Sequence, residues 1–279
     1  MTLHLAGLFV TGFMLLASSP DGRVKSLFNG KDLKGWDTYV GPRFDTVLNK
    51  FTGPAAGLNM DTEKVFSVVR IDGRGAIRIS GEHFGGISTI ESFRNYHLRL
   101  QFRWGERKWH PKKSSARDSG LLYHAVGPHG ADGNFWMRSQ EFQVQEGDCG
   151  DYWGVAGGVA DIPARKDGQN YIYDRSAPML KFSQKSDAGR HCVKHPDSEK
   201  PSGQWNTLEL YCLGDTSVHV VNGVVTMILY NLRQTADVDE IPLKEGKIQI
   251  QSEGAEVFYR DISVESIRRI PSAILTQNY

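Results

Sequence analysis

Short runs of alternating apolar and polar residues recur along this chain, and they constrain its fold more than any other feature. In residues 97–104 every even-numbered residue is apolar and every odd-numbered residue is polar, as in a half-buried strand. Asn222-Gly223 lies between two further runs and is a strong signal for a type I′ hairpin turn. No long amphipathic helix is apparent. We therefore predict an all-β fold, an antiparallel two-sheet sandwich, with strands at 65–71, 76–80, 86–92, 97–104, 121–126, 141–145, 205–213, 217–221, 224–229, 247–251 and 257–267.

The chain of 279 residues is long enough for one large β domain. We predict a single domain over residues 24–270, because no linker divides the strand candidates. Two segments are loop-like in composition, residues 37–60 and residues 154–202, and both contain glycine or proline breakers. Loops as long as the second are usually functional or mobile.

The N-terminus has the pattern of an export signal. Residues 5–17 are an apolar run followed by Ser18 and Ser19, which suits a signal peptide and is short for a membrane span. No Lys or Arg precedes the run, so the charged part of the signal is weak. We expect residues 1–19 to be a signal peptide and the bacterial protein to be secreted or periplasmic, the alternative being a buried N-terminal helix.

Charge and cysteine content narrow the partners and the chemistry. Lys and Arg number 33 and Asp and Glu number 32, interspersed along the chain, so we expect no nucleic-acid partner. The three cysteines have no zinc-site spacing. In an exported protein one disulfide and one free thiol are expected. Cys149 and Cys192 lie in loop-like sequence and form the predicted pair, while Cys212 lies in a strand candidate and is predicted to be a buried thiol.

The run 141–146, EFQVQE, indicates a binding face. In a regular strand Glu141, Gln143 and Gln145 share one face, and Phe142 and Val144 share the other. One carboxylate and two carboxamides in a row suit a surface that binds hydroxyl-rich ligands. A solvated outer face is the alternative. Several aromatic residues near this run, including those at positions 123, 136 and 153, favour an oligosaccharide or glycoside as the partner.

Six motifs in order resemble a known family: LFNGKDLKGW (27–36), DSGLLYH (118–124), EFQVQEGD (141–148), GQWN (203–206), VHVVNG (218–223) and GKIQIQSEGAEVFYRDISV (246–264). Together they resemble the 3-keto-disaccharide hydrolases, over roughly residues 25–267. The resemblance implies a concanavalin A-like jelly roll and cleavage of glycosides oxidised to a ketone at C3. Two departures are Asp118, where the family commonly has Asn, and a longer, more polar segment 156–202.

The implied reaction requires a general base, a general acid and a donor for an enolate oxygen. Glu141 and His124 are the catalytic candidates, in either order. Gln143 and Gln251 are predicted to hold sugar hydroxyls or the keto oxygen. The remaining substrate-binding candidates are Glu253, Arg260, Tyr123, and the stacking residues Trp136 and Trp153.

Two other functions stay open at this point. Glu141, Gln143 and Glu146 match the spacing of the acidic triplet in laminarinase-like retaining glycosidases, with Gln in place of the middle Asp. That mechanism requires a β-bulge to bring Glu146 to the face of Glu141, because it uses two carboxyl groups about 5 Å apart. A non-catalytic carbohydrate-binding module would use the same aromatics and glutamines without a catalytic Glu141.

An acidic turn follows the same strand candidate. Glu146, Asp148 and Asp151 offer oxygen ligands suited to a hard divalent cation, and we predict Glu146 and Asp148 as its ligands. Solvated acids in a glycine-containing turn are the alternative.

Overall fold

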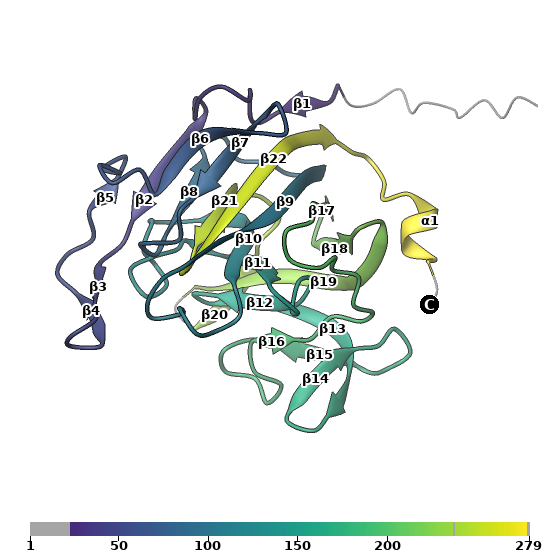
Figure 1. The fold of residues 1–279 in the computed structure, drawn as a ribbon. Helices are drawn as coiled ribbons and strands as arrows, with labels where there is room; N and C mark the ends of the chain where they lie inside the picture. Colours follow the sequence, from purple (N-terminus) through teal and green to yellow (C-terminus); the bar gives the residue numbers. More distant parts are fainter. Residues whose placement is uncertain (1–22, 237, 278–279) are drawn as a thin grey trace, which may run out of the picture.

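The computed structural model describes residues 23–236 and 238–277, and it is an antiparallel β-sandwich of two large sheets (Figure 1). This confirms the predicted fold class, and the arrangement is a concanavalin A-like jelly roll. The predicted signal peptide, residues 1–19, lies outside the described residues. Within the described residues, no helix is long and apolar enough to cross a membrane.

The larger sheet has 12 strands, and the smaller sheet has eight. In spatial order the larger sheet contains β14 (Asn170–Tyr173), β13 (Gly158–Asp167), β19 (Val224–Ala236), β18 (Thr216–Val221), β17 (Asn206–Leu213), β9 (Tyr96–Lys108), β22 (Ala255–Ser266), β7 (Arg74–Ile79) and β6 (Phe66–Ile71). Its three additional strands are β1 (Lys25–Ser26) on β22, β15 (Met179–Phe182) on β13, and β20 (Asp239–Pro242) on β19.

The smaller sheet contains, in order, β16 (His191–Cys192), β12 (Tyr152–Val155), β11 (Arg138–Gln145), β10 (Asp118–Val126), β21 (Lys247–Ser252), β8 (Gly85–Thr89), β2 (Trp36–Val40) and β5 (Gly57–Leu58). A separate hairpin is formed by β3 (Arg43–Asp45) and β4 (Lys50–Thr52). Within residues 23–236 and 238–277 the one helix is α1 (Ser272–Leu275), near the C-terminal end (Figure 1).

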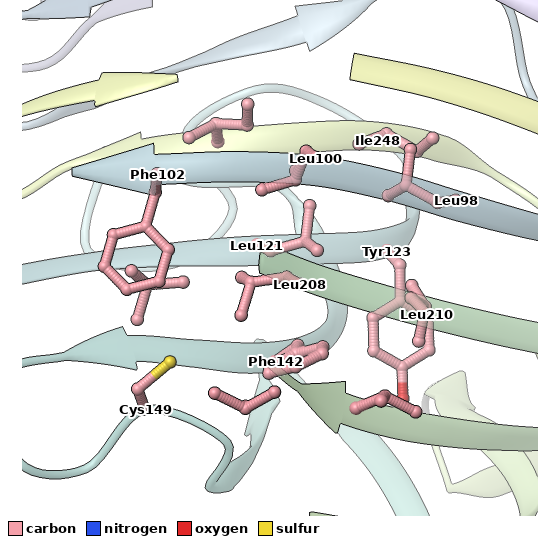
Figure 2. Close-up of a cluster of buried hydrophobic side chains, with 14 of the residues drawn as sticks. Leu98, Leu100, Phe102, Leu121, Tyr123, Phe142, Cys149, Leu208, Leu210 and Ile248 are labelled. Carbon is pink, nitrogen blue, oxygen red and sulfur yellow. The ribbon is translucent and has the colours of Figure 1, made fainter. Parts of the chain in front are cut away.

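The core lies between the two sheets, where the apolar faces of their strands meet (Figure 2). Leu98, Leu100 and Phe102 of β9 are buried, as the alternation in residues 97–104 predicts. They belong to the same hydrophobic cluster as Leu121 of β10 and Phe142 of β11. Because each strand alternates, burying these residues leaves the polar residues between them on the outer faces.

The predicted Asn-Gly hairpin is confirmed. Asn222 and Gly223 both have positive φ, 52° and 83°, as a type I′ turn requires. Val221 and Val224 pair directly across it and join β18 to β19.

Two segments predicted as loops contain strands, which corrects the prediction. The segment 37–60 contributes to β2, β3, β4 and β5, and the segment 154–202 includes β13, β14, β15 and β16. Most of these strands lie at or near sheet edges, where one partner is enough and polar or proline-containing sequence is tolerated. Their composition therefore carries little of the alternation by which central strands are recognised.

The predicted disulfide is also wrong, since Cys149, Cys192 and Cys212 are all free and buried. The side chain of Cys149 lies in the core between the sheets (Figure 2). Cys192 is in strand β16, where it pairs with Tyr152 of β12. The composition around Cys192 is loop-like and suggested a disulfide, but Cys192 lies in a strand. Burial raises the pKa of the Cys149 and Cys192 thiols, which disfavours the reactive thiolate.

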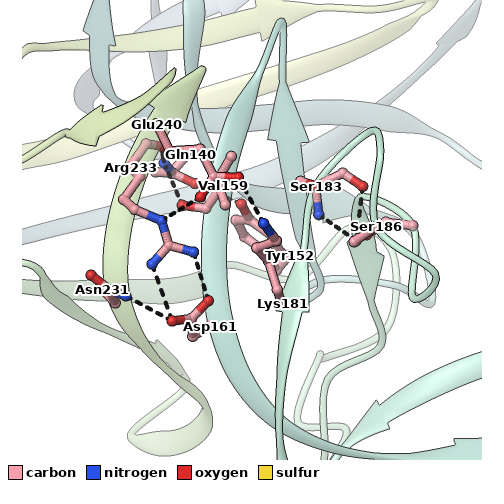
Figure 3. Close-up of polar contacts among 11 residues, drawn as sticks. Gln140, Tyr152, Val159, Asp161, Lys181, Ser183, Ser186, Asn231, Arg233 and Glu240 are labelled. Carbon is pink, nitrogen blue, oxygen red and sulfur yellow. Dashed lines mark hydrogen bonds and ion pairs between the residues drawn. The ribbon is translucent and has the colours of Figure 1, made fainter. Parts of the chain in front are cut away.

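Polar contacts join β11 and β12 to the larger sheet (Figure 3). The buried side chain of Gln140 accepts a hydrogen bond from Tyr152 Oη at 2.7 Å and donates to the Arg233 carbonyl at 2.8 Å. Arg233 in turn contacts Asp161 at 2.8 Å and Glu240 at 2.9 Å. These bonds fix the positions of the two strands that bear Glu141 and Trp153.

Candidate functional site

A cleft of about 200 Å³ lies on the outer face of the smaller sheet. Its wall includes Glu141, Gln143 and Gln145, so the predicted polar face of β11 is confirmed. Phe142 and Val144, between them, are fully buried on the core side. The other predicted site residues that line the cleft are Trp136, Asp148, Trp153, Gln251 and Glu253.

Gly120 of β10 forms a hollow in the floor of the cleft. It pairs with Gln143 of β11. Because the adjacent Leu121 pairs with Ile250 of β21 in an antiparallel register, Gly120 lies beside Gln251. A Cβ atom on Gly120 would overlap both the Glu141 carboxyl oxygen and the Gln251 amide oxygen. The missing side chain therefore allows these two polar groups to converge over the floor.

We expect Gly120→Ala to lower kcat/KM by about 10- to 100-fold, since the added methyl group displaces Glu141 and Gln251 from their positions. Gly120 has no positive φ, so the strand backbone accepts alanine without strain. Steady-state kinetics and thermal unfolding measured together test this. A variant with unchanged kcat/KM would show that the hollow has no part in the reaction.

A triad of charges closes one end of the cleft. Lys112, in the loop between β9 and β10, contacts the carboxylates of both Asp118 and Glu253. Burial raises the pKa of Asp118 to about 6, although the charge of Lys112 opposes the rise. Burial and the Asp118 charge raise the pKa of Glu253 to about 8. Burial alone would lower the pKa of Lys112, but the two carboxylates raise it above its ordinary value, so this side chain stays cationic.

Glu141 is a buried carboxyl group of the cleft, and its pKa is raised. Its side chain is 6 % exposed, and burial raises its pKa well above the ordinary value. The charges of Glu253 and Asp118 raise it further, while Lys112 and Arg190 oppose the rise. The raised pKa favours the protonated form of the Glu141 carboxyl group, which converges with the Gln251 amide oxygen over Gly120.

Trp153, His191 and Arg190 form an aromatic and cationic part of the cleft wall. Trp153 of β12 stacks on the imidazole of His191, with ring centroids 4.2 Å apart and planes inclined by 15°. The Arg190 guanidinium lies 5.4 Å from the centroid of the Trp153 ring. Trp136 donates its indole N–H to the Gly85 carbonyl at 2.9 Å, which fixes its orientation at the cleft.

His124 and Tyr123 do not lie in the cleft, so their predicted roles in catalysis and substrate binding are wrong. Both side chains are fully buried between the sheets. Tyr123 Oη is 2.7 Å from the Ser217 hydroxyl. His124 has a positive φ of 50° at a bulge of β10, and its ring contacts Tyr96 of the opposite sheet. The bulge turns His124 inward, and burial lowers its pKa to about 4.

Arg260 also lies elsewhere, which corrects its predicted contact with substrate. It is on β22 of the larger sheet, where its guanidinium lies 3.7 Å from the centroid of the Trp205 ring. Its Nε donates to the Gln101 side chain at 2.9 Å. Its role is therefore to pack the outer face of the larger sheet.

The acidic turn after β11 does not assemble the predicted cation site. Glu146 forms an ion pair with Arg117 at 3.0 Å and does not line the cleft. Asp148 accepts a hydrogen bond at 2.5 Å from Gln145, and Asp151 contacts His191 at 2.8 Å. In the part of the chain that the structure describes, no group of three or more His, Cys, Asp or Glu side chains is arranged to hold a metal ion. These residues do not fit the predicted divalent cation.

Sequence reasoning missed several residues that line the cleft: Lys112, Asp118, Asp132, Arg190 and His191. Asp118 lies in one of the family motifs, and Lys112 lies between two strand candidates, but neither pattern marks them as cleft residues. Arg190 and His191 come from the segment predicted as a loop, and no alternating pattern marks them.

A jelly roll whose outer sheet face bears a cleft of carboxyl groups, carboxamides and tryptophans is typical of carbohydrate-active proteins. The chain belongs to the family of 3-keto-alpha-glucoside-1,2-lyase-like domains, whose family model matches residues 23–265. The predicted family membership is thereby confirmed.

Solved structures of low sequence identity resemble the chain. A candidate glycosyl hydrolase from Parabacteroides distasonis is 16% identical, with 88% of this chain and 94% of that chain covered and a TM-score of 0.48. The Bacillus licheniformis beta-glucanase is 11% identical, with 90% and 100% covered and a TM-score of 0.42. The carbohydrate-binding module CBM66 from Bacillus subtilis is 10% identical, with 72% and 92% covered and a TM-score of 0.39. Among curated proteins, none matches this chain.

Proposed function

We propose that this protein cleaves glycosides that carry a ketone at C3, by β-elimination across C1 and C2. The observation that carries the proposal is the buried carboxyl group of Glu141, whose raised pKa favours its protonated form, in a cleft that also contains the cations Lys112 and Arg190 and suits a sugar. The family match supports a carbohydrate substrate.

A ketone at C3 acidifies the hydrogen on C2, so a base can remove it while the glycosidic oxygen leaves C1. Glu141 gives its proton to the leaving oxygen, a role that suits a carboxyl group with a raised pKa. Lys112 and Arg190 offer positive charge to the enolate oxygen that develops at C3. Gln143 and Gln251 hold sugar hydroxyls, and Trp136 and Trp153 supply apolar surfaces for the sugar ring.

A retaining glycosidase mechanism would require a second carboxyl group in the cleft, and the sequence predicts Glu146 for that role. Glu146 does not line the cleft, and Arg117 engages its carboxylate. A binding module remains the alternative from another class, since Gln143, Gln251 and the tryptophans suffice for binding. Export also belongs to this proposal, and N-terminal sequencing of the mature protein tests it by locating the cleavage site near residue 19.

The experiment is a paired incubation of the purified protein with a simple disaccharide and its 3-keto form, followed by measurement of free sugar. We expect cleavage of the keto form alone. Cleavage of the unoxidised disaccharide at a similar rate would contradict the proposal, because no acidic C2 hydrogen is then available. Binding of both forms without cleavage would favour the module.

A further inference from the structure

We propose that His191 is the base that removes the proton from C2, and that Asp151 holds its imidazole in the required tautomer. This inference rests on the proposed elimination and assigns the general base that the reaction requires. Neither residue was recognised as catalytic from the sequence.

The register of the smaller sheet aligns His191 with Glu141. Glu141 of β11 pairs with Trp153 of β12, and Trp153 pairs with His191 of β16. Directly paired residues point to the same face, so all three side chains are on the cleft side. Two strand spacings separate Glu141 from His191, roughly 10 Å between backbones. Both residues line the cleft, which leaves room for a sugar ring between the two side chains.

The hydrogen bond to Asp151 sets the tautomer of His191. His191 Nε2 lies 2.8 Å from Asp151 Oδ2, and a carboxylate can only accept, so the proton is on Nε2. Nδ1 then carries the lone pair. Across the described residues, Nδ1 has no hydrogen-bond partner, so the lone pair is free to accept a proton.

Asp151 is fixed in its turn by backbone and side-chain contacts. Its side chain is 1% exposed, and its Oδ1 accepts the Lys194 backbone N–H at 2.9 Å. The Asp151 carbonyl accepts the Gln143 backbone N–H at 3.0 Å, which ties the residue to the cleft strand β11. The stacked Trp153 ring, 4.2 Å away, limits rotation of the imidazole. This constellation resembles an oriented base more than a solvated surface histidine.

Other carboxyl groups of the cleft are less suited to the role. Asp118 and Glu253 both contact Lys112, which stabilises their ionised forms and engages their oxygens. The raised pKa of Glu141 suits it to serve as the acid. His191 therefore offers the one imidazole among the cleft residues that the structure describes.

The proton balance closes over the two steps. His191 Nδ1 takes the C2 proton, the C2–H electron pair forms the C1–C2 double bond, and the C1–O bond breaks as Glu141 protonates the leaving oxygen. Water then adds to C1 and gives a proton to the Glu141 carboxylate. The His191 imidazolium exchanges its Nδ1 proton with solvent and then gives a proton to C2, which restores both residues.

The test separates the base from the acid by following exchange of the C2 hydrogen of a 3-keto disaccharide in D₂O. We expect His191→Ala to slow both C2 exchange and cleavage by at least about 100-fold, and added imidazole to restore part of the exchange. Glu141→Gln should lose cleavage but keep C2 exchange. Asp151→Asn should lower kcat more than it raises KM. Circular dichroism and thermal unfolding confirm that each variant is folded.

C2 exchange at the wild-type rate in folded His191→Ala, or in His191→Asn should the alanine variant fail to fold, would overturn the assignment. Loss of exchange without any rescue by imidazole would also count against a direct proton transfer. Failure of the proposed function is a different result, in which the wild-type protein itself neither exchanges C2 nor cleaves the keto substrate.

Discussion

Replacing Glu141 with glutamine should lower kcat for a 3-keto disaccharide by about 10²–10⁴-fold while the protein still binds the substrate. Glutamine preserves the shape of the side chain and its contacts over Gly120 but cannot deliver a proton to the leaving oxygen. Because the variant removes the group with the strongly raised pKa, it also removes the loss of activity expected as pH rises through that pKa. Steady-state kinetics across pH, with calorimetric binding, measure both effects.

Gln143→Ala is the matched control for this variant, because Gln143 lies on the same face of the same strand. It removes a hydrogen-bonding group without a proton-transfer role, so we expect KM to rise more than kcat falls. If Glu141→Gln changed only KM as well, Glu141 would be a binding residue and the protein would be better described as a carbohydrate-binding module.

Replacing Lys112 with methionine should destabilise the protein by about 3–5 kcal/mol at neutral pH, the range seen when one partner of a buried ion pair is removed. Methionine fills similar volume but leaves Asp118 and Glu253 without a countercharge. Their pKa values, already raised to about 6 and about 8, should then rise further. Urea unfolding gives the free-energy difference.

The sign of the pH dependence follows from these shifts. A carboxyl group with a raised pKa binds more protons in the folded state, so stability is lost as pH rises from the unfolded pKa through the folded one. Lys112→Met should therefore cost more stability at pH 8 than at pH 5. Lys113→Met is the control, because Lys113 is exposed and adjacent. Equal small effects of both variants would contradict a structural role for the charge triad.

The sequence predicts the central part of this molecule well because alternation and burial are directly linked. The strand 141–145 shows this, since its polar residues line the cleft and Phe142 and Val144 enter the core. The same rule, applied to Leu121, would have placed Tyr123 in the core. Ion pairs between residues far apart in the sequence are harder to predict. The residues around Lys112 and Glu253 give no sign that these two side chains are in contact.

The errors arise where the regular period of two is broken or absent, or where it does not tell which sheet a strand joins. His124 would share the outer face with Gly120 if β10 were regular, but the bulge with positive φ turns it into the core. Arg260 follows an alternating pattern correctly, yet the pattern does not tell which sheet its strand joins. His191 lies in a strand of only two residues, too short for a periodic signal.

The most direct test of the proposed elimination is to cleave a 3-keto disaccharide with the wild-type protein in D₂O and to analyse the released keto sugar by mass spectrometry and NMR. Hydration of the enone should place one deuterium at C2, above the level in a matched incubation without protein. Rapid cleavage with no deuterium at C2 would contradict the account, because it would show substitution at C1 without removal of the C2 proton.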